Sequence, residues 1–439
     1  MPPTGGRFGK MFDLGPARYD AADLERLANA MIVRADAADR ESTLPAGYTY
    51  FGQFIGHDIT FDATSSLRQD RDPATLADFR TPRFDLDCVY GTGPVDQPFL
   101  YDDGEVKLLL GELLDNGRDF DVPRVAPTER AIIADPRNDE NVIIAQLHSA
   151  FIRFHNRLAG EDGGASFRAI QEKVRWHYQW IVLHDFLRNI VNKVTYDDVL
   201  PHVNANSNPG VHPPRLRFYD WSEGTYLPVE FSAAAYRFGH STIRPSYLLN
   251  DIPGGGGPFD ILGQRPASDL RGFRRFNRLW SVDWSLFFGG PRRVQRAHKI
   301  DAALAEPLAR LPFAGMQDMP SLPLRNLTRG MRLRLPSGQA VCEEMHIEAI
   351  SDEQLLVGGS TMRLTDISPN FRGKAPLWYY ILAEAQQLGG NQLGPVGGRI
   401  VMETVVGLML ADDESFIVKD PSWRPRARSI AELIQIAAS

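Results

Sequence analysis

A glutamine, a histidine and an aspartate lie close together in an otherwise apolar stretch, YFGQFIGHDITFD, at residues 50–62. Polar side chains are costly to bury without partners, so this stretch indicates a site rather than plain core. Gln53 and His57 are four residues apart and would share one face of a helix. Asp58 would point about 100° away, which predicts that it serves a different site from His57.

Four further polar clusters lie in FRTPRFDLDCVYG, DPRNDE, RFGHSTIRP and NLTRG. Each cluster alone has a simple structural interpretation. A single histidine such as His240 is more often a hydrogen-bonded core or surface residue than a ligand. Asp85 and Asp87 are more often turn acids than metal ligands. Arg137 and Glu140 would most simply form an i,i+3 ion pair at a helix start.

The composition is that of a globular protein with a large core. The chain has 439 residues, of which 43% are hydrophobic, and a net charge of -7. This acidic balance argues against a general nucleic-acid binder. The two cysteines, Cys88 and Cys342, are too few for a disulfide framework or a cysteine-based zinc site.

The first residues show no basic segment followed by an apolar one, so we expect no cleaved secretory signal. No apolar run approaches the length of a membrane span. These features predict a protein of the cytoplasm, or one exported without a cleaved signal. The sequence leaves the oligomeric state open.

The apolar pattern predicts a mainly α-helical protein with very little β-structure, because sustained alternation is rare. Apolar residues from Ile144 to Leu158 repeat at spacings of three and four, which predicts a helix. Further helices are expected at about 21–35, through 174–194, and as a pair in 376–416 separated by a turn rich in glycine and proline. We expect one domain, with an N-terminal arm (1–45), a core (46–424) and a C-terminal helix (425–439).

Together and in this order, the five polar segments resemble the animal-type haem peroxidases, of the peroxidase–cyclooxygenase superfamily, and in particular its compact bacterial members. The resemblance runs from about Leu44 to about Arg424. The segments resemble, in turn, the distal-histidine segment, the calcium loop, the distal-arginine helix, the proximal-histidine helix and the segment of the proximal asparagine. The resemblance implies a single large helical domain that holds a haem between its central helices.

On the proximal side, the resemblance implies that His240 binds the iron of a haem b-derived cofactor. Asn326 would accept a hydrogen bond from the outer nitrogen of that ring and fix its tautomer. Arg329 and Arg237 would pair with the haem propionates, as arginines pair with carboxylates.

On the distal side, the resemblance implies that His57 takes a proton from hydrogen peroxide and returns it to the leaving oxygen. Arg137 would stabilise the charge that develops as the O–O bond breaks. Gln53 would hold water or peroxide. The resulting ferryl haem would oxidise a small donor such as a phenol, iodide, bromide or thiocyanate, and the sequence does not select among them.

The resemblance also implies a calcium ion that joins a loop to the distal helix. Its ligands would be Asp58, Thr81, the backbone oxygen of Arg83, Asp85 and Asp87. Oxygen ligands of this kind suit calcium. Asp87 stands where many relatives carry a serine, which adds negative charge.

Two positions depart from the family pattern. Many relatives carry an aspartate just before the distal histidine, where it forms an ester with the haem, but this chain has Gly56. Glu140 matches the second ester donor, so we expect at most one covalent link. Asn141 stands where a methionine forms the sulfonium bond of myeloperoxidase. We therefore expect no sulfonium bond and no oxidation of chloride.

Two other functions remain open. Fatty-acid dioxygenases of the superfamily use a tyrosine three residues before the proximal histidine, but Arg237 stands there and Tyr236 is one residue off. A haem- or calcium-binding protein with little turnover is the second alternative, because a fold does not guarantee activity. Peroxide turnover distinguishes the binding protein from the enzymes, and oxygen uptake with a fatty acid distinguishes the dioxygenase from the peroxidase.

Overall fold

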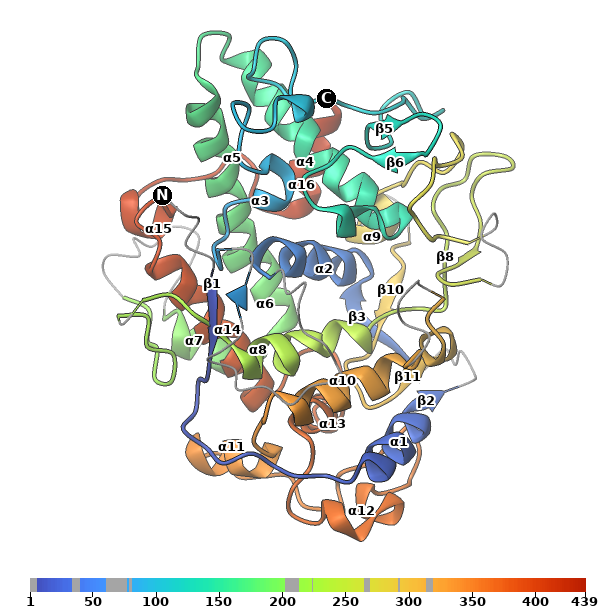
Figure 1. Cartoon of the computed structure of the whole chain (residues 1–439), viewed down its shortest axis with the longest axis vertical. Coiled ribbons are helices and arrows are strands. Elements are labelled where there is room, and N and C mark those ends of the chain that lie inside the picture. The colour runs from blue at the N-terminus through green and yellow to red at the C-terminus, as the bar shows by residue number, and fades with distance from the viewer. Residues whose placement is uncertain are drawn as a thin grey trace.

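The computed structural model describes residues 6–33, 40–60, 77–78, 81–201, 213–222, 224–263, 269–290, 293–312 and 319–439. Helices make up most of the regular structure there, and the strands are two to five residues long (Figure 1). The prediction of a mainly helical protein is confirmed. Among the described residues, we find no helix that is long and apolar enough to cross a membrane.

The α-helices are α1 (Ala21–Ala30), α2 (Gly47–Ile59), α3 (Asp87–Tyr90), α4 (Val142–Glu161), α5 (Phe167–Ile181), α6 (Leu187–Ile190), α7 (Lys193–Val199), α8 (Val229–Ala233), α9 (Ser285–Phe288), α10 (Leu322–Arg332), α11 (Gly338–Glu344), α12 (Leu364–Ile367), α13 (Leu377–Gln387), α14 (Pro395–Leu410), α15 (Phe416–Lys419) and α16 (Ile430–Ala438). The 3₁₀ segments are η3 (Pro98–Leu100), η4 (Pro136–Asp139), η7 (Ala235–His240), η9 (Glu306–Ala309) and η10 (Pro369–Phe371), and η5 (Val182–Phe186) is a π-helical turn.

The strands form small ribbons rather than a central sheet. They are β1 (Gly6–Gly9), β2 (Ile32–Val33), β3 (Glu41–Pro45), β4 (Ala77–Asp78), β5 (Arg124–Val125), β6 (Arg130–Ala131), β7 (Leu227–Pro228), β8 (Ser246–Tyr247), β9 (Phe259–Asp260), β10 (Arg296–His298) and β11 (Leu304–Ala305). The strand orders are β4-β1-β7, β10-β3, β11-β2, β5-β6 and β8-β9.

Helix α2 crosses the middle of the molecule (Figure 1). Strand β10 contacts both the strand that precedes α2 and the end of η7. Strand β3 leads directly into α2 and pairs with β10 in antiparallel register. The backbone N–H of His298 in β10 donates to the carbonyl of Thr242, just beyond η7, at 3.0 Å. Strand β10 therefore ties the start of α2 to the end of η7.

Helix α4 begins where the sequence predicts, because Asn141 caps it. The Asn141 side chain accepts hydrogen bonds from the backbone N–H groups of Ile143 and Ile144. The apolar face of α4 packs on α2, where the rings of Phe54 and Phe151 stack with their centroids 4.6 Å apart. Stacking and burial of this kind hold the two helices in register.

Two predicted helix boundaries are wrong. The helix expected through residues 174–194 runs from α5 through η5 to α6 and stops at Val191, whose backbone is extended. It stops there because Asn192 caps a new helix, α7, by accepting from the N–H of Thr195. The helix expected at 21–35 ends at Ala30, where the chain enters strand β2. Residues 34–35 lie outside the described residues.

The two C-terminal helices, α13 and α14, are present, but the break between them ends earlier than the glycines suggest. Helix α14 starts at Pro395, and Glu384 accepts from the N–H groups of Val396 and Gly397. Gly397 lies inside the helix. A Cβ at this position would come 2.5 Å from the Ile381 side chain, which explains why the residue is a glycine. Close helix packing, rather than a turn, explains this glycine.

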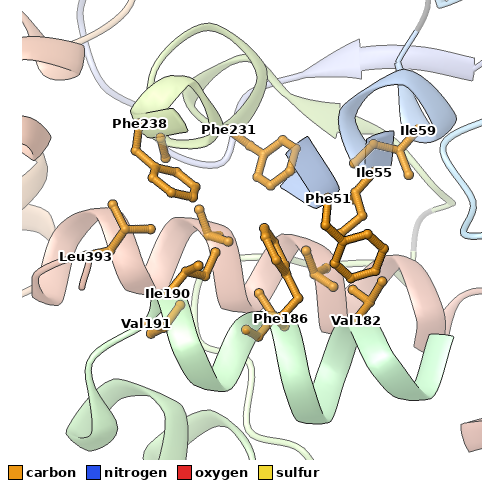
Figure 2. Packing of buried hydrophobic residues seen from close by; sticks show 14 of the residues in the cluster. Phe51, Ile55, Ile59, Val182, Phe186, Ile190, Val191, Phe231, Phe238 and Leu393 are labelled. Carbon is orange, nitrogen blue, oxygen red and sulfur yellow. The ribbon is translucent and has the colours of Figure 1, made fainter. Parts of the chain in front are cut away.

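A hydrophobic core lies between α2 and η7 on one side and the helical segment η5–α6 on the other (Figure 2). Phe51 of α2, Phe186 of η5, and Phe231 and Phe238 of α8 and η7 point toward one another. All four are almost completely buried. Burial of one such ring stabilises the fold by about 2 kcal/mol. The connected cluster extends from Phe8 to Ala437, and the division into arm, core and C-terminal helix stays a prediction.

Candidate active site

One face of α2 keeps accessible surface although the helix lies inside the molecule. Thr49, Gly52, Gln53, Gly56 and Thr60 are partly exposed, and every residue between them is buried. Their spacing of three and four residues places them on one side of the helix. Most are small, so this stripe leaves room beside α2.

The opposite wall is η7, which also keeps accessible surface at Tyr236 and His240. The Tyr236 hydroxyl donates to the carbonyl of Gly52 at 3.1 Å, so the ring closes one edge of the space. A Cβ at Gly56 would lie 3.4 Å from Tyr236 Cε1, whereas a Cβ at Gly239 would meet nothing within 4 Å. The accessible sides of α2 and η7 therefore face the same space.

The other edge is closed by two hydroxyls. Oγ1 of Thr49 lies 2.8 Å from Oγ1 of Thr242, and either group can donate. Thr242 lies two residues beyond the end of η7, so this bond links the two walls near the start of α2.

His57 lies near the end of α2, and two side chains of η4 hold it. Its Nδ1 is 2.8 Å from Oδ1 of Asn138. Nη2 of Arg137 donates to the backbone carbonyl of His57 at 2.7 Å. One short 3₁₀ segment thus contacts both the ring and the backbone of the same histidine.

Segment η4 is itself fixed by Asp135, which is fully buried. Its carboxylate accepts from the backbone N–H of Arg137 at 2.9 Å and pairs with the guanidinium at 2.7 Å. Breaking this pair would leave the fully buried Asp135 carboxylate without its charged partner, so the pair holds its geometry. On the far side of η4, Nδ2 of Asn138 lies 3.0 Å from Nδ1 of His148 in α4.

Gln53 and Glu140 form a second polar contact across the site. Nε2 of Gln53 donates to Oε1 of Glu140 at 2.5 Å, and Asn141 Nδ2 lies 3.4 Å from Gln53 Oε1. Glu140 therefore has Gln53 as its hydrogen-bonding partner, while Arg137 forms its ion pair with Asp135. Burial raises the pKa of Glu140 to about 7, although the Gln53 bond and the charge of Arg137 oppose the rise.

His240 ends segment η7 and points its Nδ1 toward helix α10. This nitrogen lies 2.8 Å from Nδ2 of Asn326, which is buried. Burial, and then the charge of Arg237, lower the pKa of His240 to about 3. A neutral imidazole is the form that binds a metal ion.

The expected contact between His240 and Asn326 is present, but its direction is reversed. The amide nitrogen faces His240, while Arg237 Nη1 lies 3.4 Å from the amide oxygen and Arg237 Nε donates to the carbonyl of Ser232. A histidine that binds iron through Nε2 carries its proton on Nδ1, so the amide would have to turn over. Arg329 lies one turn beyond Asn326 on α10 and is partly exposed.

The predicted calcium residues gather on another side of α2. Asp58 is fully buried and accepts from the backbone N–H groups of Leu86 at 3.2 Å and Cys88 at 3.4 Å. Leu86 adopts a left-handed φ of 61°, which turns the loop around the carboxylate. Burial, followed by the charges of Asp87 and Asp58, holds the pKa of Asp85 well above its usual range.

Thr81 and Arg83 form a tight turn in the same loop, in which the N–H of Arg83 donates to the carbonyl of Thr81 at 2.7 Å. The donor set is rich in oxygen, as calcium requires. Over the described ranges, however, no three His, Cys, Asp or Glu side chains are spaced to hold one ion. His57 and Asp58 thus contact different segments, η4 and the 85–88 loop.

The sequence patterns do not single out Asn138, His148 or Thr242 as site residues. Asn138 directly follows the candidate Arg137, which was the one local signal. His148 lies on a helix that was recognised only by its apolar repeat. The contact between His57 and Asn138 joins residues 81 positions apart, so only the fold shows it.

Comparison with known sequences links part of the chain to one family. Residues 69–260 match the sequence model of the animal haem peroxidase, a range that includes Arg137 and His240 but neither His57 nor Asn326. Thyroid peroxidase of Sus scrofa is 31% identical over 126 residues, which are 27% of this chain and 13% of that protein. Heme peroxidase 2 of Caenorhabditis elegans is 28% identical over 188 residues, which are 39% and 25%. The chain spans at most a quarter of the length of these two relatives.

The fold comparison covers nearly the whole chain. Peroxidase A of Dictyostelium discoideum matches with a TM-score of 0.71 at 14% sequence identity, over 99% of this chain and 93% of that one. The fatty acid alpha-dioxygenase of Oryza sativa matches with a TM-score of 0.63 at 13% identity, over 99% and 80%. At these identities the likeness shows a shared fold.

Proposed function

The chain is a relative of the animal haem peroxidases, by its sequence over residues 69–260 and by its fold, and from that premise we propose that it is a haem peroxidase. Its substrates would be hydrogen peroxide and a small electron donor. The single observation that carries the proposal is that α2, which bears His57, and η7, which ends at His240, border one space.

The residues present fit a haem. The stripe of small side chains on α2 and the open surroundings of Gly239 leave room for a flat group between the walls. His240 is neutral and would bind the iron. Arg237 lies near it, Arg329 lies one turn beyond Asn326 on α10, and both would pair with the propionates. Bound haem would supply an iron centre that binds peroxide and provides the two electrons for its reduction, which the small donor would then restore.

The acid–base work falls to His57. Its Nδ1 faces the carbonyl oxygen of Asn138, so Nδ1 carries the ring proton and Nε2 keeps a lone pair. A histidine in this form takes a proton from one peroxide oxygen and returns it to the oxygen that leaves as water. Gln53 would orient water or peroxide beside it, and Arg137 would stabilise negative charge near the end of α2.

Two finer assignments belong to the same proposal. Glu140 would form at most one ester with the haem, because Gly56 offers no carboxylate for a second one. A calcium ion would be held by Asp58, Asp85, Asp87, Thr81 and the Arg83 carbonyl. The backbone N–H groups that now donate to Asp58 would have to release its carboxylate first. The donor would be a phenol, iodide, bromide or thiocyanate.

The dioxygenase alternative has one observation in its favour. Tyr236 borders the same space as His57, and the alpha-dioxygenases share the fold. Its hydroxyl, however, donates to a backbone carbonyl, which is a poor proton acceptor for radical formation. Arg237 occupies the position expected for the radical tyrosine.

Three assays on the haem-loaded protein separate the candidates. Oxidation of a phenol and of iodide with peroxide is the result expected of a peroxidase. Oxygen uptake with a long-chain fatty acid, without peroxide turnover, would replace it with the dioxygenase. A protein that binds haem but does neither would be a binding protein.

A further inference from the structure

We propose that Asn138 and His148 are positioning residues that keep the ring proton of His57 on Nδ1, so that Nε2 stays available to accept a proton. This inference rests on the proposed peroxidase function for its catalytic meaning. It concerns a chain of three side chains, His57 in α2, Asn138 in η4 and His148 in α4.

The chain is defined by two hydrogen bonds through one amide. Oδ1 of Asn138 lies 2.8 Å from Nδ1 of His57, and Nδ2 of Asn138 lies 3.0 Å from Nδ1 of His148. An amide has one accepting end and one donating end, so the two rings must take opposite roles. His57 then donates from Nδ1, and His148 accepts at Nδ1 and carries its proton on Nε2.

Burial makes this arrangement exclusive. Asn138 has no exposed surface and His148 is 1% exposed, so neither can exchange a bond for water. A buried polar group without a partner destabilises the folded state. The amide therefore turns over only if both rings change tautomer at once.

The surroundings fix the amide as well. The backbone N–H of Asn138 donates to the carbonyl of Asp135 at 3.0 Å, and the Asp135 carboxylate binds the neighbouring Arg137. Burial lowers the pKa of His148 to about 4, so this ring is neutral and can accept.

The direction of the amide also suits the reaction. When His57 holds a second proton, its Nδ1–H faces an oxygen that stabilises the positive ring. With the opposite amide orientation, the neutral His57 ring would carry its proton on Nε2. The doubly protonated ring would then place its Nδ1–H against the amide N–H, so that two donors face each other. Asn138 thus favours both protonation states that proton transfer requires.

The test is a tautomer measurement by nitrogen NMR on haem-free protein labelled with ¹⁵N-histidine. We expect the Nδ1–H tautomer at His57 and the Nε2–H tautomer at His148. Asn138→Leu removes both bonds and should abolish the preference at His57. Asn138→Asp keeps an acceptor toward both rings, so His57 should keep its tautomer while His148 moves its proton from Nε2 to Nδ1.

Gln146→Leu is the matched control. Gln146 lies on the same helix as His148, is 2% exposed, and bonds to the Trp280 carbonyl and the Val282 N–H. Its loss removes two buried hydrogen bonds without touching His57, so both tautomers should stay as in the wild type.

After haem loading, Asn138→Leu should react with peroxide at least 10-fold more slowly, Asn138→Asp within a few-fold of wild type, and Gln146→Leu at the wild-type rate. An Nε2–H tautomer at His57 in the wild type, or an unchanged tautomer in Asn138→Leu, would overturn the inference. If Asn138→Leu does not fold, the wild type and Asn138→Asp decide it. A wild type with the expected tautomers that ignores peroxide would instead overturn the proposed function.

Discussion

Nδ1 of His57 lies 2.8 Å from Oδ1 of Asn138, although 81 residues separate them in the sequence. The contact brings the ring of one helix against a 3₁₀ segment that also delivers Arg137 to the His57 backbone. The polar residues that stood out in an apolar run thus find their partners on η4 and on the loop around Asp58. The candidate site exists because α2 and η4 meet there.

Loss of the proposed iron ligand should abolish haem binding at the site. His240→Ala removes the neutral imidazole that Asn326 positions, so we expect no Soret band characteristic of histidine ligation and at least 10-fold weaker haem retention. Absorption spectra during haem titration measure both. His346→Asn is the control, because His346 is exposed and has a left-handed φ of 55° that asparagine tolerates. Equal haem binding by both variants would exclude His240.

The carboxyl of Glu140 should make the haem-free protein lose stability as the pH rises. Burial raises its folded-state pKa from 4.5 to about 7, while the unfolded chain ionises near 4.5. Between these values the unfolded state binds fewer protons, so the free energy of unfolding falls with rising pH. Glu140→Gln keeps the acceptor for Gln53 and escapes this penalty.

The stability advantage of the variant over the wild type should therefore grow by about 3 kcal/mol between about pH 4 and about pH 8, as measured by denaturant unfolding. Other buried carboxyls change both proteins alike and cancel in the difference. A difference that is constant across this range would mean that the carboxyl of Glu140 is not desolvated.

Calcium should stabilise the wild-type protein through Asp58 and its loop. Binding to the folded state alone adds about 2.7 kcal/mol at a concentration 100 times the dissociation constant, and raises the melting temperature accordingly. Asp85→Asn removes one of the interacting carboxylates and should lose most of that response. Asp103→Asn, at an exposed position, should keep it. A wild type whose melting temperature ignores calcium and its chelators contradicts the site.

Covalent attachment of haem should depend on Glu140 alone. Some haem should stay with the wild type after turnover and acid–ketone extraction, and none with Glu140→Gln. Gly56→Asp should increase the attached fraction, because a Cβ there makes an ordinary 3.4 Å contact with Tyr236. Gly56→Asn, of the same size without a carboxylate, is its control. Mass spectrometry of the denatured chains reads out the linkage, and attached haem in Glu140→Gln would disprove the assignment.

The helices that carry the site could be predicted because their signals are local. The apolar repeat from Ile144 to Leu158 and the capping Asn141 define α4, and the spacing of Gln53 and His57 defines the faces of α2. The break at Val191 does not show in the sequence pattern, because it depends on one cap, at Asn192, within a continuous apolar pattern.

The candidate residues could be named from the sequence, but their partners could not. The bonds of Asn138 to two histidines and of Gln53 to Glu140 join distant segments, and no local pattern encodes them. The resemblance predicts that Asn326 turns its amide oxygen toward His240. In the structure the amide nitrogen faces His240, because Arg237 competes for the oxygen.

The most direct test of the account is the rate at which haem-loaded protein reacts with one equivalent of hydrogen peroxide, followed by rapid-mixing absorption. If His57 is the acid–base group, His57→Leu should slow this reaction by about 10²–10⁴-fold while its haem content matches that of the wild type. Gln146→Leu should react at the wild-type rate. Equal rates for the wild type and His57→Leu would contradict the account.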